Sequence, residues 1–113
     1  MSDDGPDIEI IRERVRRGNY LIKSHAVMHA VKEGFDRHHM VEALLNGKII
    51  EKYSDDQRVL VCGQVALTEG LQIYLHVVCE YADPVYAEFV TAYIPDESQW
   101  QNPPFSRRRK TRK

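Results

Sequence analysis

Hydrophobic and polar residues alternate with two different periods along the chain, and the change comes near residue 47. Before that point, apolar residues recur every three or four positions, which is the spacing of one face of an α-helix. After it, apolar residues recur at every second position, which is the spacing of one face of a β-strand. Helices followed by strands predict an α+β domain in which the helices cover one face of a sheet.

The first part of the chain predicts three helices. They span residues 7–18, 24–35 and 36–45, and a glycine at or near the end of each (Gly18, Gly34 and Gly47) suits a helix boundary. Residues 20–23 contain three apolar residues, too few for a clear pattern. They fit either a small edge strand or an extended link between the first two helices.

The second helix has two different faces. Ser24 suits its N-cap, and Gly34 suits the left-handed residue that ends a helix. The apolar face consists of Ala26, Val27, Ala30 and Val31, and the opposite face of His25, His29 and Lys32. The polar face fits two interpretations, a solvated surface or one wall of a functional site.

The second part of the chain predicts four strands, at residues 48–53, 58–67, 71–81 and 85–94. Short connections between consecutive strands favour a four-stranded antiparallel sheet. In the third strand, the odd-numbered residues from Leu71 to Cys79 are predicted to face the helices.

The register of the last two strands decides which side chains share a face with His76. If Glu80 pairs with Val85, then His76 lies on the same face as Phe89, Thr91 and Tyr93. A shift by one residue would move Thr91 and Tyr93 to the other face.

Length and composition favour one soluble domain. The chain has 113 residues, of which 42% are hydrophobic and 29% charged. No apolar run is long enough for a membrane span, and the acidic start does not resemble a signal peptide. Cys62 and Cys79 lie in predicted strands and are expected to be buried free thiols of a cytoplasmic protein.

Charge is distributed unevenly, although the net charge is only −1. Six of the 16 basic residues lie in residues 107–113, where no acidic residue occurs. We therefore predict one α+β domain over residues 1–106 and a disordered basic tail over residues 107–113. The tail fits two interpretations, contact with phosphates or a solvated end that keeps the protein soluble. The predicted nucleic-acid-binding residues are Lys32, Arg107, Arg108, Arg109 and Lys110.

The titratable residues fit metal-free RNA cleavage better than metal chemistry. RNA cleavage without metal needs a base, an acid and a cation that stabilises the phosphorane. His25 and His29 have the spacing of a zinc helix, but the glutamate of H-E-x-x-H is missing and no third ligand has a fitting spacing. We therefore predict no metal and no cofactor. The predicted catalytic residues are His25, His29, His76 and Tyr93.

Several short motifs, in order, resemble one bacterial family, the domain of unknown function 4258. They are Ser24-His25-Ala26, Ile50-Glu51-x-Tyr53, Leu75-His76-Val77-Val78, Thr91-Ala92-Tyr93-x-Pro95 and Trp100. The helix-then-sheet layout of that family is similar to RelE-like and BrnT-like toxins, which are small ribonucleases of toxin–antitoxin pairs. The resemblance implies a toxin-like, RNA-directed protein, a metal-independent endoribonuclease with an antitoxin-like partner protein.

The chain departs from the family motif S-H-A-x-x-R-x-x-E-R-G in the second helix. His29 replaces the first arginine, Lys32 the glutamate and Glu33 the second arginine. A permanent bidentate cation is thereby lost at position 29. Two alternatives follow: an altered nuclease with His25, His29, His76 and Tyr93 in one groove, or a non-catalytic module that binds nucleic acid or protein.

Overall fold

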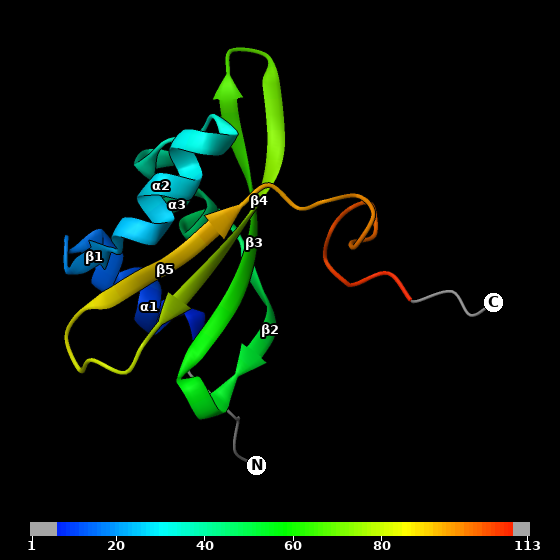
Figure 1. Ribbon diagram of the computed structural model, residues 1–113. Coiled ribbons are helices and arrows are strands. Elements are labelled where there is room, and N and C mark those ends of the chain that lie inside the picture. The colour runs from blue at the N-terminus through cyan, green and yellow to red at the C-terminus, as the bar shows by residue number, and fades with distance from the viewer. Residues whose placement is uncertain (1–6, 110–113) are drawn as a thin grey trace.

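The computed structural model describes residues 7–109, which form three α-helices on one side of a five-stranded sheet (Figure 1). The helices are α1 (Ile8–Arg16), α2 (Ser24–Glu33) and α3 (Arg37–Asn46). The strands are β1 (Tyr20–Ile22), β2 (Lys48–Tyr53), β3 (Arg58–Thr68), β4 (Leu71–Glu80) and β5 (Ala87–Tyr93), with a short 3₁₀ turn, η1 (Ser54–Asp56), between β2 and β3. The α+β prediction and the helix-covered face are therefore confirmed.

The sheet differs from the prediction in having a fifth, parallel strand. Its order is β1-β5-β4-β3-β2, and β1 runs parallel to β5 while the other neighbours are antiparallel. The prediction of four antiparallel strands was wrong because β1 has only three residues, too few to show an alternating pattern. Its partner also lies far along the chain, so no local turn marks the pairing. The mixed sheet does not confirm the RelE-like layout.

The hydrophobic core lies between the helices and the sheet. Leu75, Val77 and Cys79 of β4 are fully buried there, as their alternation predicts, and they pack with residues of all three helices. Leu71, at the start of the same strand, is 48% exposed because the β3–β4 hairpin extends past its neighbours (Figure 1). The predicted inner face of β4 is confirmed over the part of the strand that the helices cover.

The packing face of α2 is narrower than its sequence predicts. Ala26 and Ala30 are buried against β5, whereas Val31 is 77% and Met28 is 70% exposed. Two small side chains bring the helix close to the edge of the sheet, and the neighbouring positions then point past it. Gly34 ends the helix with φ of 86°, as predicted, but Lys23 rather than Ser24 occupies the N-cap position.

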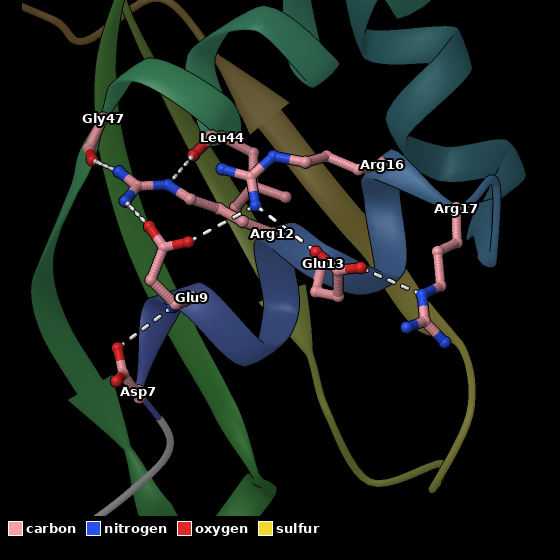
Figure 2. Close-up of polar contacts among 8 residues, drawn as sticks. All are labelled: Asp7, Glu9, Arg12, Glu13, Arg16, Arg17, Leu44 and Gly47. Carbon is pink, nitrogen blue, oxygen red and sulfur yellow. Dashed lines mark hydrogen bonds and ion pairs between the residues drawn. The ribbon is translucent and has the colours of Figure 1, made fainter.

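Arg12 attaches α1 to the junction between α3 and β2 (Figure 2). Its guanidinium donates hydrogen bonds to the carbonyl oxygens of Leu44, at 3.3 Å, and of Gly47. Glu9 accepts a third hydrogen bond from the same group at 2.6 Å. Arg12 thus satisfies carbonyl groups at the end of α3 that lack partners within the helix.

Gly63 lets α3 lie directly on β3. A Cβ atom at this position would lie 2.7 Å from the Cα of Ala43 and closer still to its carbonyl oxygen. Any side chain here would push α3 away from the sheet, so the glycine fixes the distance between the two layers.

The C-terminal segment (residues 95–109) lies on the side of the sheet opposite the helices (Figure 1), and Pro104 and Arg107 contact β4 and β2 there. Trp100 is 3% exposed and forms an isolated antiparallel bridge with Arg107. The Trp100 ring also packs edge-on against His76 of β4, and this contact ties the segment to the body of the domain. Within residues 7–109, no helix is long and apolar enough to cross a membrane.

Candidate functional site

The four predicted catalytic residues form two separate pairs on opposite sides of the sheet. His25 and His29 belong to α2, on the helix-covered face, and their rings stack with centroids 5.7 Å apart. His76 and Tyr93 lie on the other face, with ring centroids 5.2 Å apart. The predicted single groove is therefore wrong. In β4 the helix-facing positions belong to Leu75 and Val77, so His76 between them must point the other way.

His29 attaches α2 to β5. Its Nδ1 donates a hydrogen bond to the carbonyl oxygen of Ala92 at 2.8 Å, since a carbonyl can only accept. One turn later, Glu33 accepts a hydrogen bond from the backbone amide of Ile94 at 2.8 Å. These two side chains hold the helix on the end of the strand, while His25 remains exposed. The helical period placed His29 opposite the apolar face of α2. It could not show that α2 lies near the edge of the sheet, where a residue of the polar face can reach a backbone carbonyl of β5.

His76 is fully buried and both of its ring nitrogens have partners. Nε2 donates to the carbonyl oxygen of Pro104 at 2.8 Å, and Nδ1 lies 3.3 Å from the Tyr93 hydroxyl, from which it accepts. Trp100 packs edge-on against the ring at a centroid distance of 4.4 Å. Burial lowers the pKa of His76, so the neutral form is favoured. His76 supports the C-terminal segment and has no nitrogen free for a substrate.

The observed register explains which partners of His76 were predicted correctly. His76 pairs with Tyr93, and Val78 pairs with Thr91, so Thr91 and Tyr93 share its face as expected. A bulge after Val78 then shifts the register, and Phe89 pairs with Cys79 in the core. Glu80 pairs with Glu88 rather than with Val85, so the condition for placing Phe89 on the face of His76 is not met. The bulge puts Phe89 on the face opposite to Thr91 and Tyr93.

A polar cluster lies on the same face as His76, at the edge of the C-terminal segment. Arg107 forms two hydrogen bonds with Glu51, Nε to Oε2 at 2.7 Å and Nη2 to Oε1 at 3.0 Å. The Tyr53 hydroxyl donates a hydrogen bond to Glu51 Oε1 at 2.5 Å. Glu51 and Tyr53 belong to one of the family motifs, but they were not predicted to be site residues. Their i, i+2 spacing in a strand, which places both on one face, was the available signal.

The charges of this polar cluster shift the pKa values of its members. Hydrogen bonds from Arg107 hold the pKa of Glu51 below its usual value, and Glu51 in turn raises that of Arg107. Burial, together with the hydrogen bond to Glu51, raises the pKa of Tyr53. Burial raises the pKa of Tyr93 to about 12. At neutral pH the cluster thus contains one carboxylate, one guanidinium and one protonated phenol, and the phenol of Tyr93 is protonated as well.

Two cations lie over aromatic rings beside the polar cluster. Lys48 Nζ is 4.3 Å from the ring centroid of Phe105, and the Arg107 guanidinium carbon is 4.6 Å from that of Trp100. Tyr74 continues the row, since it packs edge-on against Phe105 at 5.5 Å. We call these residues the cation–aromatic row (Lys48, Tyr74, Trp100, Phe105 and Arg107).

The predicted nucleic-acid-binding residues are divided by the sheet. Lys32 lies on α2, whereas Arg107 and Arg108 belong to the C-terminal segment on the opposite face. Arg108 donates from Nε to the carbonyl oxygen of Glu97 at 2.5 Å. The expected start of a disordered tail at residue 107 therefore falls within a segment that contacts the domain. Arg109 is exposed, and Lys110 lies outside the described residues.

One possible metal-ligand group occurs among the described residues, at the start of α3. It consists of Asp36, His38 and His39, with ligand atoms within 4.8 Å of one another. His39 Nδ1, however, already accepts a hydrogen bond from the amide of Asp36 at 2.8 Å and so caps the helix. His39 is buried, and its ring is held in this capping contact.

Cys62 and Cys79 are free and buried, as predicted. Burial raises the pKa of Cys62 to about 11 and also raises that of Cys79. Neither thiol is therefore ionised at neutral pH, and neither is a candidate nucleophile.

Comparison with known proteins identifies one family. The family described as "Domain of unknown function (DUF4258)" matches residues 22–94, which is more than half of the chain. This span contains α2, α3, β2 to β5 and both members of the His76–Tyr93 pair, and it ends just before the C-terminal segment. No match was found among curated proteins or among solved structures.

Proposed function

Because the chain belongs to the family described as "Domain of unknown function (DUF4258)", whose description states no activity, we propose a function from the site itself. The domain is a toxin-like, RNA-directed protein that binds single-stranded RNA. The binding surface is the C-terminal segment and the sheet face beside it, not the histidine face of α2.

The cation–aromatic row is the observation that supports this proposal. Proteins bind single-stranded nucleic acid by stacking bases on aromatic rings while cations contact the phosphates. Lys48 and Arg107 each lie within 5 Å of an aromatic centroid, so cations and rings lie side by side. Trp100 is buried, and the partly exposed rings of the row are Tyr74 and Phe105. Arg108 and Arg109 extend the positive charge along the same segment. Half of the Arg107 side chain is exposed and remains accessible to a phosphate.

Fluorescence anisotropy of a labelled single-stranded oligoribonucleotide, titrated at several salt concentrations, tests RNA binding. Each lost phosphate contact lowers the slope of log K against log salt by about 0.7 for a single strand. Lys48→Gln and Arg108→Gln should each weaken binding and flatten this slope. Arg17→Gln serves as the matched control, because Arg17 is an exposed arginine on α1 that pairs only with Glu13. Equal slopes for all three variants would contradict the proposed surface.

Metal-independent RNA cleavage is a second candidate function, favoured by the polar cluster. Glu51 could accept the proton of a 2′-hydroxyl, Tyr53 could protonate the leaving 5′-oxygen, and Arg107 could stabilise the phosphorane. These three side chains are already in hydrogen-bond contact with one another. Cleavage on this view persists in excess EDTA and is lost in Tyr53→Phe, while RNA binding is kept. If purified protein binds RNA and leaves it intact, the function is that of a non-catalytic binding module.

A partner protein of the antitoxin kind and a cytoplasmic location complete the proposal. Met28 and Val31 expose apolar surface on α2, on the side of the domain away from the proposed RNA surface. The two free thiols favour a reducing compartment. Co-purification from cell lysate with full-length protein, compared with Val31→Glu, tests the partner.

A further inference from the structure

A small cavity lies between the C-terminal segment and the first part of β4, near Ile73 and Tyr74. Its volume is about 180 Å³. The walls combine aromatic and aliphatic side chains with two amides and one carboxylate, principally Tyr74, Ile94, Trp100, Glu97, Gln101 and Asn102. Cavities for drug-sized ligands are larger, about 300–1,000 Å³, so this one suits a single flat ring system.

The polar groups of the cavity can bind a ligand. Within residues 7–109, no hydrogen bond joins the side-chain amide of Gln101 or Asn102 to another protein group. An amide offers both a donor and an acceptor, which matches the mixed edge of a nucleobase. The carboxylate of Glu97 accepts hydrogen bonds from base N–H groups and repels phosphate. A nucleotide would therefore place its base inside and its phosphate outside.

The cations lie where that phosphate would be. Trp100 forms a wall of the cavity and carries Arg107 over its ring at 4.6 Å. Tyr74 forms another wall and contacts Phe105, over which Lys48 lies at 4.3 Å. One ring, Trp100, thus separates the cavity from Arg107, and two rings, Tyr74 and Phe105, separate it from Lys48.

We propose that this cavity binds one unstacked nucleobase of a single-stranded RNA whose neighbouring phosphates contact Lys48 and Arg107. The proposal rests on the proposed RNA function and adds to it a site that reads the base rather than the backbone. Stacking on the partly exposed ring of Tyr74 holds the base, and the amides of Gln101 and Asn102 contact its edge.

Trp100 provides the measurement, because it is the only tryptophan of the chain and lines the cavity. A short RNA oligomer, an abasic ribose-phosphate oligomer of equal length and a nucleoside 5′-monophosphate are titrated while tryptophan emission is followed. We expect the RNA and the mononucleotide to quench the emission saturably, and the abasic oligomer to bind at least tenfold more weakly than RNA.

Two variants from the same segment provide the control. Gln101→Ala combined with Asn102→Ala should weaken RNA binding on the order of tenfold, as expected for two lost hydrogen bonds. Gln99→Ala, an exposed glutamine outside the cavity, should leave it unchanged.

The possible outcomes separate this proposal from the RNA function. Equal binding of the abasic oligomer and RNA, or equal affinity of the double variant and Gln99→Ala, would overturn the base site while RNA binding stands. Failure of every oligomer to bind would overturn both.

Discussion

His76 and Tyr93 face each other as directly paired residues of β4 and β5, with His76 Nδ1 3.3 Å from the Tyr93 hydroxyl. The other ring nitrogen reaches the carbonyl oxygen of Pro104. One buried imidazole thus joins the sheet to the C-terminal segment that carries the proposed RNA surface. The contact depends on a neutral ring, which makes it sensitive to pH.

We predict that the domain loses stability as pH falls below about 6.5. In the folded state burial lowers the pKa of His76, while the unfolded chain keeps a value near 6.5. The unfolded state therefore binds more protons below that pH, and the free energy of unfolding falls by at most about 1.4 kcal/mol per pH unit. Urea titrations at pH 7.5 and 5.0 measure the loss. His76→Gln, whose amide can still donate and accept, should reduce the loss between the two pH values. If both proteins lose the same free energy of unfolding between pH 7.5 and 5.0, titratable groups other than His76 cause the loss.

The packing of β4 gives a second prediction. Leu75 is fully buried against the helices, so Leu75→Ala should lower the free energy of unfolding by about 2–5 kcal/mol. Leu71→Ala, in the same strand but half exposed, should cost much less. Chemical denaturation compares the two. A Leu75→Ala loss below about 0.5 kcal/mol would mean that this face of β4 is not the core face.

A third prediction concerns the attachment of α1. Arg12 donates to two carbonyl oxygens at the α3–β2 junction, and removal of the guanidinium leaves both without that partner. Arg12→Ala should therefore destabilise the domain by about 2 kcal/mol. Arg16→Ala is the matched control, because Arg16 contacts only glutamates at the surface of the same helix. Similar thermal midpoints for the two variants would show that Arg12 does not anchor α1.

Hydrophobic periodicity predicted the elements whose partners are near in sequence. The alternation in β4 is one example. The glycine that ends α2, Gly34, was likewise predicted from the residues next to it in the sequence. Pairing of β1 with β5 and the bulge after Val78 depend on distant parts of the chain, and no local pattern marks either.

The site was harder to predict than the fold for the same reason. A helical period places His25 and His29 on one face, but it cannot say which side of the sheet the helix covers. Arg107 and Glu51 are 56 positions apart in the sequence, and they meet only because the C-terminal segment folds back onto the sheet. Its basic residues had instead favoured a disordered tail, because a run of like charges is most often solvated.

A fourth prediction concerns the histidines of α2. His25 is exposed and lies on the side of the domain opposite the proposed RNA surface, so His25→Ala should change neither RNA affinity nor stability. His29→Leu should leave RNA affinity unchanged but lower the free energy of unfolding by about 1 kcal/mol, since its hydrogen bond to Ala92 is lost. Anisotropy and urea titrations separate the two effects. A tenfold loss of RNA affinity in His25→Ala would restore the α2 face as the site.

The most direct test of the central claim is to map RNA contact residue by residue. Backbone amide NMR spectra of the full-length protein are recorded during titration with a single-stranded oligoribonucleotide. We predict that amides of β2 near Lys48 and of the C-terminal segment, including Trp100 and Arg107, shift with a common affinity. Amides of α2 from His25 to Lys32 should stay unchanged. Shifts confined to α2, with the C-terminal segment unaffected, would contradict the account.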